Sequence, residues 1–256
     1  PTRLEARCVA LYALRCYLPL SLVARGIRRL GRRARGAANR QEPVNRLPEA
    51  GWRVLLPARA VRLAAPSRAN GNVRLSELAV LAQAAAATEP NREIVEIGTF
   101  DGRTTLNLAI NSSSSCRVFT LDLPPEAPTR FPLDRRERKF VEKPAPGARF
   151  RGCDGAWEPA AARITQLLGD SASYDWSAHE GKAGLVFVDG SHAYEYAKSD
   201  SEAAFRLVVP GGMVLWHDYG VWPGVTRYLE ELEERDGLGL RRIQGTSLIF
   251  WRRPSP

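Results

Sequence analysis

Apolar runs alternate with amphipathic stretches along most of the chain, and this alternation indicates strands followed by helices. The clearest run, Leu-Val-Phe-Val at residues 185–188, is typical of a strand buried on both faces of a parallel sheet. Further strands are predicted at 94–97, 117–122, 148–152 and 213–218. Helices are predicted at 76–86, 104–110, 157–168 and 189–209. This order predicts an α/β fold with a Rossmann-like, doubly wound and mostly parallel sheet.

The C-terminal residues predict a different kind of strand pairing. Residues 227–234 are predicted as an acidic helix. Residues 240–243 and 247–251 are predicted to pair as a hairpin around Gly245. Because a hairpin joins antiparallel strands without a long crossover, the last strand of the sheet is expected to be antiparallel.

The first 70 residues are predicted as a basic N-terminal extension, helical and then irregular, and residues 71–256 as the α/β domain. Residues 4–24 are rich in Leu, Ala and Val. Arg7 and Arg15 lie within this run, and Pro19 also interrupts it, so a transmembrane span is not expected. A run of arginines follows the apolar residues, whereas a signal peptide carries its charge before them.

The net charge of +9 comes from arginine, much of it before Leu63, and therefore describes the extension more than the domain. Two arrangements of the extension remain open. It can form a helical cap on its own domain or on a second copy of the chain, or it can lie on an anionic lipid surface. Cys8, Cys16, Cys116 and Cys153 form no C-x-x-C pair, which favours a reduced, cytoplasmic setting, with peripheral membrane contact as the second option.

A turn between the strand at 94–97 and the next helix has the composition of a ligand site. Glu96 lies near the strand's end, Gly98 and Thr99 begin the turn, and Gly102 precedes the helix. Glycine lets the backbone approach a ligand closely, and the helix start offers unpaired N–H groups. A carboxylate before the glycines would repel a pyrophosphate but suits a cationic group.

An acid ends the following strand, about 20 residues past the glycines. Asp122 stands where a βαβ unit places the acid that binds ribose hydroxyls. This position supports a nucleoside ligand without choosing among cofactors, since enzymes that bind NAD share it. The alternative is a surface acid that caps a turn.

The Glu96-x-Gly98-x-x-x-Gly102 turn resembles motif I of the class I methyltransferases that use S-adenosylmethionine (SAM). The resemblance implies that Glu96 faces the methionine end of SAM and that the glycines make room for it. It further implies that Asp122 binds the ribose and that Asp154, after the strand predicted at 148–152, lies near the adenine.

Two neighbouring strands end in acids that are expected to converge. Asp189 follows one strand, and His217 and Asp218 end the other, so all three are expected at one edge of the sheet. Residues 188–195, 210–212 and 216–219 resemble metal-dependent O-methyltransferases that act on macrolide sugars and aminocoumarins, and their cephalosporin-pathway relatives. The resemblance implies a divalent metal such as Mg²⁺ on these three side chains.

This chain departs from that group, which commonly has two adjacent acids where His217-Asp218 stands here. An imidazole suits a transition metal better than Mg²⁺. His192 and His217 are the candidate bases, because histidine titrates near neutral pH, and Asp189 is the third candidate catalytic residue. The alternatives are a core histidine bonded to a neighbour for His217 and a helix-start residue bonded to backbone for His192.

The expected function is SAM-dependent O-methylation of a small-molecule hydroxyl with help from a divalent metal. One alternative is an NAD-dependent oxidoreductase, against which the missing third glycine argues. Another is a non-catalytic module that uses the Arg-rich extension on a membrane or nucleic acid. For the enzyme, the expected partners are the small-molecule acceptor and a second copy of the chain, and nucleic acid is not expected. Residues 124–146 are predicted as a mobile loop with a short helix near the site, and a solvated run of charges is an equal alternative.

Overall fold

The computed structural model describes residues 46–65, 73–133, 136–141 and 146–256. The predicted N-terminal helix, with its lipid or subunit contacts, lies outside the described residues. So does the predicted domain boundary, which falls in the segment 66–72. Both stay predictions.

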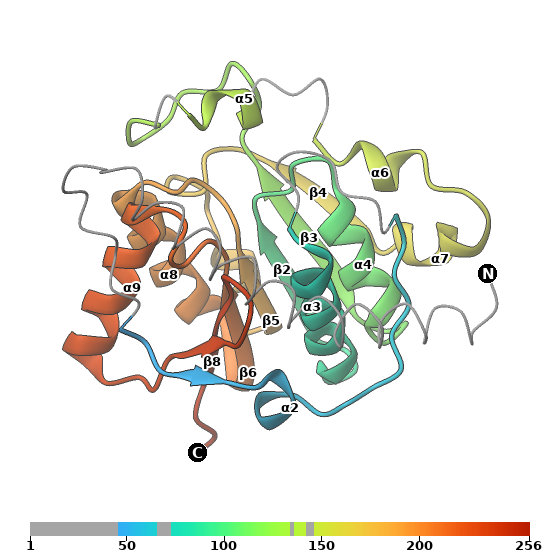
Figure 1. Cartoon of the computed structure of the whole chain (residues 1–256). Coiled ribbons are helices and arrows are strands. Elements are labelled where there is room, and N and C mark those ends of the chain that lie inside the picture. Colours follow the sequence, from blue (N-terminus) through green and yellow to red (C-terminus); the bar gives the residue numbers. More distant parts are fainter. Residues whose placement is uncertain (1–45, 66–72, 134–135, 142–145) are drawn as a thin grey trace, which may run out of the picture.

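The described residues form an eight-stranded sheet in the order β1-β7-β8-β6-β5-β2-β3-β4 (Figure 1). Neighbouring strands are parallel, except that β8 runs antiparallel to both β6 and β7, which confirms the predicted hairpin. The strands are β1 (Glu49–Ala50), β2 (Glu93–Ile97), β3 (Arg117–Asp122), β4 (Ile164–Leu168), β5 (Ala183–Val188), β6 (Val208–Trp216), β7 (Arg241–Ile243) and β8 (Ile249–Arg252).

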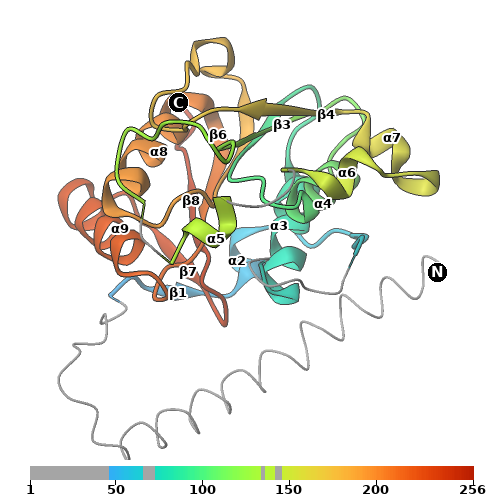
Figure 2. The same ribbon diagram turned by 90° about the horizontal axis from the view of Figure 1, so that it is seen from above.

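Helices cover both faces of this sheet, as Figure 2 shows from above. On one side lie α3 (Leu75–Ala87) and α4 (Arg103–Asn111), and on the other α8 (Tyr194–Leu207) and α9 (Pro223–Asp236). Alternate residues of β5 enter the two cores, Val186 toward α8 and α9 and Phe187 toward α3 and α4. The strand is apolar throughout because both of its faces are buried.

Two predicted elements between β3 and β5 are wrong. Residues 148–152 are not a strand, because Ala148–Arg151 form the short helix α6, whose Phe150 packs against Gly102. Residues 157–168 are not one helix: α7 (Glu158–Ala161) is a single turn, and the chain then enters β4. The edge position of β4 explains the error, since its side chains are only partly buried and show no continuous apolar run.

Residues 46–65 already belong to the sheet layers. β1 pairs in parallel with β7, the Leu47 amide donates to the Tyr219 hydroxyl at 3.1 Å, and α2 (Trp52–Leu55) packs Trp52 into the core. In the parts of the chain that the structure describes, no helix is long and apolar enough to cross a membrane.

Strand register brings the functional edge together. Ile97 of β2, Val188 of β5 and Trp216 of β6 lie side by side as the ends of three neighbouring strands. The Asp189 amide then donates to the Ile97 carbonyl at 2.8 Å, and the His217 amide to the Val188 carbonyl at 3.0 Å. The residues that follow these strands therefore meet at one edge, as predicted.

Gly98 allows the cofactor turn and the end of β5 to touch. Its φ is +102°, and a Cβ there would lie 2.1 Å from the Asp189 carbonyl oxygen. We expect Gly98→Ala to lower the free energy of unfolding by more than about 3 kcal/mol, through strain and this clash. Gly51→Ala is the control, because a Cβ at Gly51 meets nothing within 4 Å, and we expect a change of at most about 1 kcal/mol. Urea unfolding of both variants measures the difference, and equal losses would contradict the prediction.

Candidate active site

A cavity of about 290 Å³ opens at the carboxyl ends of the strands. Its floor comes from the glycine turn and the residues that follow β3, β4, β5 and β6. Leu133, Glu137, Phe140 and Val141 line it from the segment around α5 (Arg138–Val141), which lies above the strand ends (Figure 1). The predicted short helix near the site is thus present. Ligands of open α/β sheets bind at this edge.

Asp122 lines the cavity and holds the glycine turn in place. Its Oδ2 accepts a hydrogen bond of 2.7 Å from the Phe100 amide, and its Oδ1 accepts one of 2.9 Å from the Leu123 amide. Phe100 has a φ of +49°, a left-handed conformation that is uncommon for a bulky residue. The carboxylate therefore fixes an unusual turn while facing the space where a ligand would lie.

Three other predicted cofactor residues support the turn from outside the cavity lining. Glu96 is fully buried, and the hydroxyls of Thr105 and Thr120 donate to its Oε2, the latter at 2.6 Å. Thr99 is buried against Thr120, and the hydroxyl oxygens of the two lie 2.7 Å apart. Gly102 packs on Phe150. Direct contact of these residues with a cofactor stays a prediction.

The structure places the candidate adenine acid, Asp154, away from the cavity. Asp154 is exposed, precedes a short 3₁₀ turn and does not line the cavity. Asp170 and Ser171 do line it, directly after β4 and Gly169. Sequence reasoning missed them because it placed the strand too early. The available signal was an acid after Leu-Leu-Gly, which repeats the pattern of acids that follow strands.

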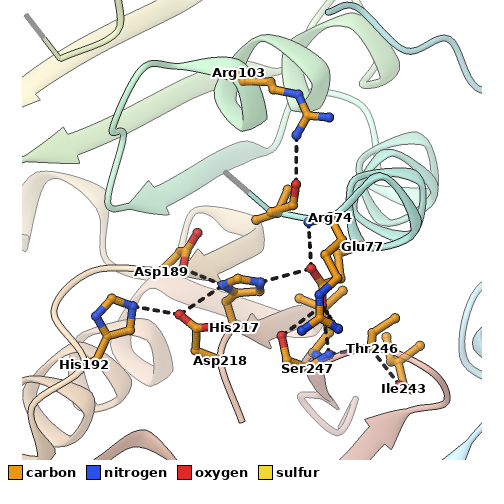
Figure 3. Close-up of polar contacts among 12 residues, drawn as sticks. Arg74, Glu77, Arg103, Asp189, His192, His217, Asp218, Ile243, Thr246 and Ser247 are labelled. Atoms are coloured by element: carbon orange, nitrogen blue, oxygen red, sulfur yellow. Dashed lines mark hydrogen bonds and ion pairs between the residues drawn. The ribbon is translucent and has the colours of Figure 1, made fainter. Parts of the chain in front are cut away.

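Asp189, His192, His217 and Asp218 form one cluster at the other end of the cavity (Figure 3). His217 Nδ1 lies 2.9 Å from Asp189 Oδ1 and 3.4 Å from Asp218 Oδ2. His192 Nε2 lies 2.7 Å from Asp218 Oδ2. Asp218 has a φ of +66°, so its backbone turns sharply after β6. The structure thus brings together all the predicted catalytic and metal residues.

Glu77 of α3 joins this cluster through His217, and sequence reasoning missed it (Figure 3). Its Oε1 accepts hydrogen bonds of 2.9 Å from both the amide and the hydroxyl of Ser247, and its Oε2 accepts one of 2.8 Å from the Arg74 amide. His217 Nε2 lies 3.2 Å from the same Oε2. Both ring nitrogens of His217 therefore face carboxylates.

Glu137 is the second carboxylate that sequence reasoning missed. Because of it, both ring nitrogens of His192 also face carboxylates. Glu137 lies just before α5 and is buried. Glu137 Oε1 lies 2.5 Å from His192 Nδ1 and also accepts from the His192 amide, while the Ser191 hydroxyl donates to the carboxylate. No short-range sequence signal indicates this contact, since 55 positions separate Glu137 from His192.

The electrostatics of the cluster follow from this pairing. Burial alone would lower the pKa of each imidazole, but the carboxylates of Asp218 and Glu137 raise that of His192 to about 9. Asp189, Asp218 and Glu77 raise the pKa of His217 well above its ordinary value. Burial tends to raise the pKa of Asp218 as well, yet the two imidazoles hold it far below its usual range. At neutral pH both rings therefore carry positive charge beside the ionised carboxylates of Glu77 and Asp218. Burial raises the pKa of the Asp189 carboxyl, although the imidazole of His217 opposes this shift.

The donor set can hold a metal ion. One ligand atom each from Asp189, His192 and Asp218 lie within 4.8 Å of one another. This group contains His192, whereas the predicted set contained His217. Two carboxylates and an imidazole suit a divalent ion such as Mn²⁺ or Zn²⁺.

Comparison with known proteins identifies the class. A family model described as a methyltransferase domain matches residues 95–219, which span the glycine turn, Asp122 and the acid–imidazole cluster. The chain is therefore a class I SAM-dependent methyltransferase, and SAM is the cofactor of that class. This match decides between the two enzyme classes that the sequence left open. A search of curated proteins finds no match.

Solved structures support the fold. The chain resembles the O-methyltransferase NovP at 16% identity, over 71% of this chain and 81% of that one, with a TM-score of 0.52. It resembles a protein from Corynebacterium glutamicum at 17% identity, over 76% and 84%, with a TM-score of 0.50. The O-methyltransferase TomG from Streptomyces achromogenes, solved with SAM, aligns at 20% identity over 71% and 82%, with a TM-score of 0.48. At these identities the first two comparisons establish the fold alone.

Glu96 gives the site a measurable pH dependence. Burial raises the pKa of its carboxyl from 4.5 to about 8 in the folded protein. Between these pH values the unfolded chain releases the proton and the folded chain keeps it, so the free energy of unfolding falls as pH rises. We expect Glu96→Gln to remove up to roughly 4–5 kcal/mol of this fall between pH 5 and 9. Urea unfolding at both pH values tests this, and equal slopes for variant and parent would contradict it.

Proposed function

We propose that this methyltransferase transfers the methyl group of SAM to a hydroxyl group of a small molecule, with help from a divalent cation. One observation carries the proposal. A single cavity connects Asp122, the candidate ribose acid, to the cluster of Asp189, His192 and Asp218. A nucleoside-binding end and an acid–imidazole end in one cavity provide for a cofactor and a reacting hydroxyl side by side.

At the nucleoside end, Asp122 accepts hydrogen bonds from the ribose, and the turn after Gly98 makes room for the methionine part. We assign the adenine end to Asp170 and Ser171, since they follow β4 and line the cavity where Asp154 does not. Six carboxylates of the described residues line the cavity, and they favour the positively charged sulfonium and ammonium groups of SAM. These carboxylates are those of Glu77, Asp122, Glu137, Asp170, Asp189 and Asp218.

At the other end, Asp189 and Asp218 would hold the divalent cation together with an imidazole. A bound cation of this kind lowers the pKa of the acceptor hydroxyl and orients it. Asp189 is central among the chain's own groups, because it directly follows β5 and His217 donates to it. The acceptor oxygen would attack the methyl carbon as the carbon–sulfur bond breaks, and S-adenosylhomocysteine (SAH) would leave. The hydroxyl proton would pass to a carboxylate of the cluster, since both imidazoles already carry a proton on each ring nitrogen.

The apolar part of the lining favours a small acceptor held close to the cluster. Phe100 and Phe140 pack edge to face with ring centroids 5.9 Å apart, and Val221 is half exposed beside Trp222. Apolar walls with a few fixed polar groups are typical of small-molecule sites. Holding the acceptor in line with the methyl group supplies much of the rate in such a transfer.

The cofactor half of the proposal is tested by calorimetry with SAH. We expect Asp122→Asn to weaken SAH binding by at least about tenfold, because the ribose loses a charged acceptor. Asp154→Asn is the matched control and should leave the dissociation constant within about twofold, since Asp154 lies outside the cavity lining. Equal losses in the two variants, or no heat with the parent protein, would contradict the assignment.

The chemical half is tested at Asp189. We expect Asp189→Asn to keep SAH binding within about threefold while methyl transfer falls at least about 100-fold, because the cluster loses a carboxyl group that can bind the cation or take up a proton. Mass spectrometry of a panel of hydroxylated acceptors measures the transfer. Asp236→Asn, at an exposed residue paired with Arg235, is the control. Full transfer in Asp189→Asn would exclude this residue from the chemistry.

A further inference from the structure

His192 has a partner on each side of its ring, and the two partners differ in kind. Its Nε2 faces Asp218 at 2.7 Å, on the side of the group that can hold a metal. Its Nδ1 faces Glu137 at 2.5 Å, on the side of the segment that carries α5. The side chain of His192 is only 13% exposed, so the ring has little room to turn away from either.

The Glu137 carboxylate makes several contacts with His192 and its neighbour Ser191. The carboxylate is 4% exposed, and it accepts from the His192 amide and the Ser191 hydroxyl as well as facing the ring. These contacts fix both the backbone and the ring of His192 relative to one carboxylate. A metal-binding histidine typically donates its second ring N–H to a carboxylate, which sets the tautomer and the direction of the ligating nitrogen.

On the other face of the ring, Trp222 stacks on His192 with centroids 4.3 Å apart and an interplanar angle of 14°. Gly224 permits this approach, because a Cβ there would lie 2.4 Å from the His192 carbonyl oxygen. The stacking on Trp222, just before α9, therefore fixes the plane of the imidazole, and the contact of Glu137 with Nδ1 fixes its rotation within that plane. These contacts hold the ring so that its Nε2 points toward Asp218 and the group that can hold a metal.

We propose that His192 is a ligand of the divalent cation and that Glu137 is its positioning residue. The inference rests on the proposed function and assigns its imidazole ligand to His192, whereas the sequence-based metal set contained His217. It also ties the metal to the segment above the cavity, because Glu137 and the cavity-lining Phe140 lie within one short stretch. Metal binding and the seating of residues 136–141 then stabilise each other, since coupling between two binding events is reciprocal.

The test uses Mn²⁺ as the probe and the full chain with ¹⁵N-labelled histidine. Pulsed electron paramagnetic resonance counts the histidine nitrogens coupled to bound Mn²⁺, and a titration gives the affinity. We expect His192→Gln to remove one coupled nitrogen and to weaken binding by at least about tenfold. Glu137→Gln should weaken binding by about 10–100-fold and keep the nitrogen count. Glu180→Gln, in an exposed pair with Arg206, should change neither quantity.

Hydrogen exchange supplies a readout that a purely structural role of Glu137 would not move. Mn²⁺ should slow amide exchange over residues 136–141 in the parent protein but not in Glu137→Gln. An unchanged nitrogen count in His192→Gln, parent-like affinity in Glu137→Gln, or no Mn²⁺ binding at all would overturn the inference. SAH calorimetry separates failure of this inference from failure of the proposed cofactor site. A protein that binds SAH but no Mn²⁺ remains a methyltransferase and lacks this metal site. If His192→Gln does not fold, Glu137→Gln decides.

Discussion

The structure depends on charge compensation among side chains that are almost entirely removed from water. Glu77, Asp189 and Asp218 surround His217, and Glu137 and Asp218 flank His192, at the edge of the sheet where β5 and β6 end. An unpaired charge in such a place is strongly destabilising, and a pair is tolerated only when its geometry and hydrogen bonds are good. Here the pairing joins α3, β5, β6, the hairpin at Ser247 and the segment before α5. The same contacts that make the buried acids tolerable also assemble the candidate active site.

The central strands were readable from the sequence because burial on two faces requires continuous apolar runs, as in Leu185 and Val186. The edge strand β4 was not, since one side of it meets solvent and Gln166 interrupts it to donate to Thr99 at 3.0 Å. Because the strand was predicted too early, the acid expected after it was taken to be Asp154, whereas Asp170 is the acid that follows β4. Asp122, Asp189 and Asp218 were readable because each ends or closely follows a strand, and parallel strands place their carboxyl ends at one edge.

Other parts of the site depend on tertiary contacts that no local pattern encodes. Glu77 meets His217 across 140 positions of sequence, and nothing near Glu77 marks it as different from an ordinary acid in a helix's first turn. The orientation of Glu96, by contrast, could have been predicted from the alternation of side chains along β2, which the motif argument did not use. Side chains alternate along a strand, so Glu96 shares a face with Ile94, which packs on the side of α3 and α4. It therefore faces Thr105 of α4 beneath the turn.

The contact between Gly98 and the Asp189 backbone has a consequence for how such an enzyme can diversify. It joins the glycine turn to the end of β5, so the turn and the acid–imidazole cluster form one unit whose spacing tolerates no added atom. Phe140 of α5 and Val221 after β6 line the cavity from outside that unit. Under the proposed function, new acceptors can be accommodated by exchanging residues of these two segments, while the spacing between the turn and the cluster stays unchanged.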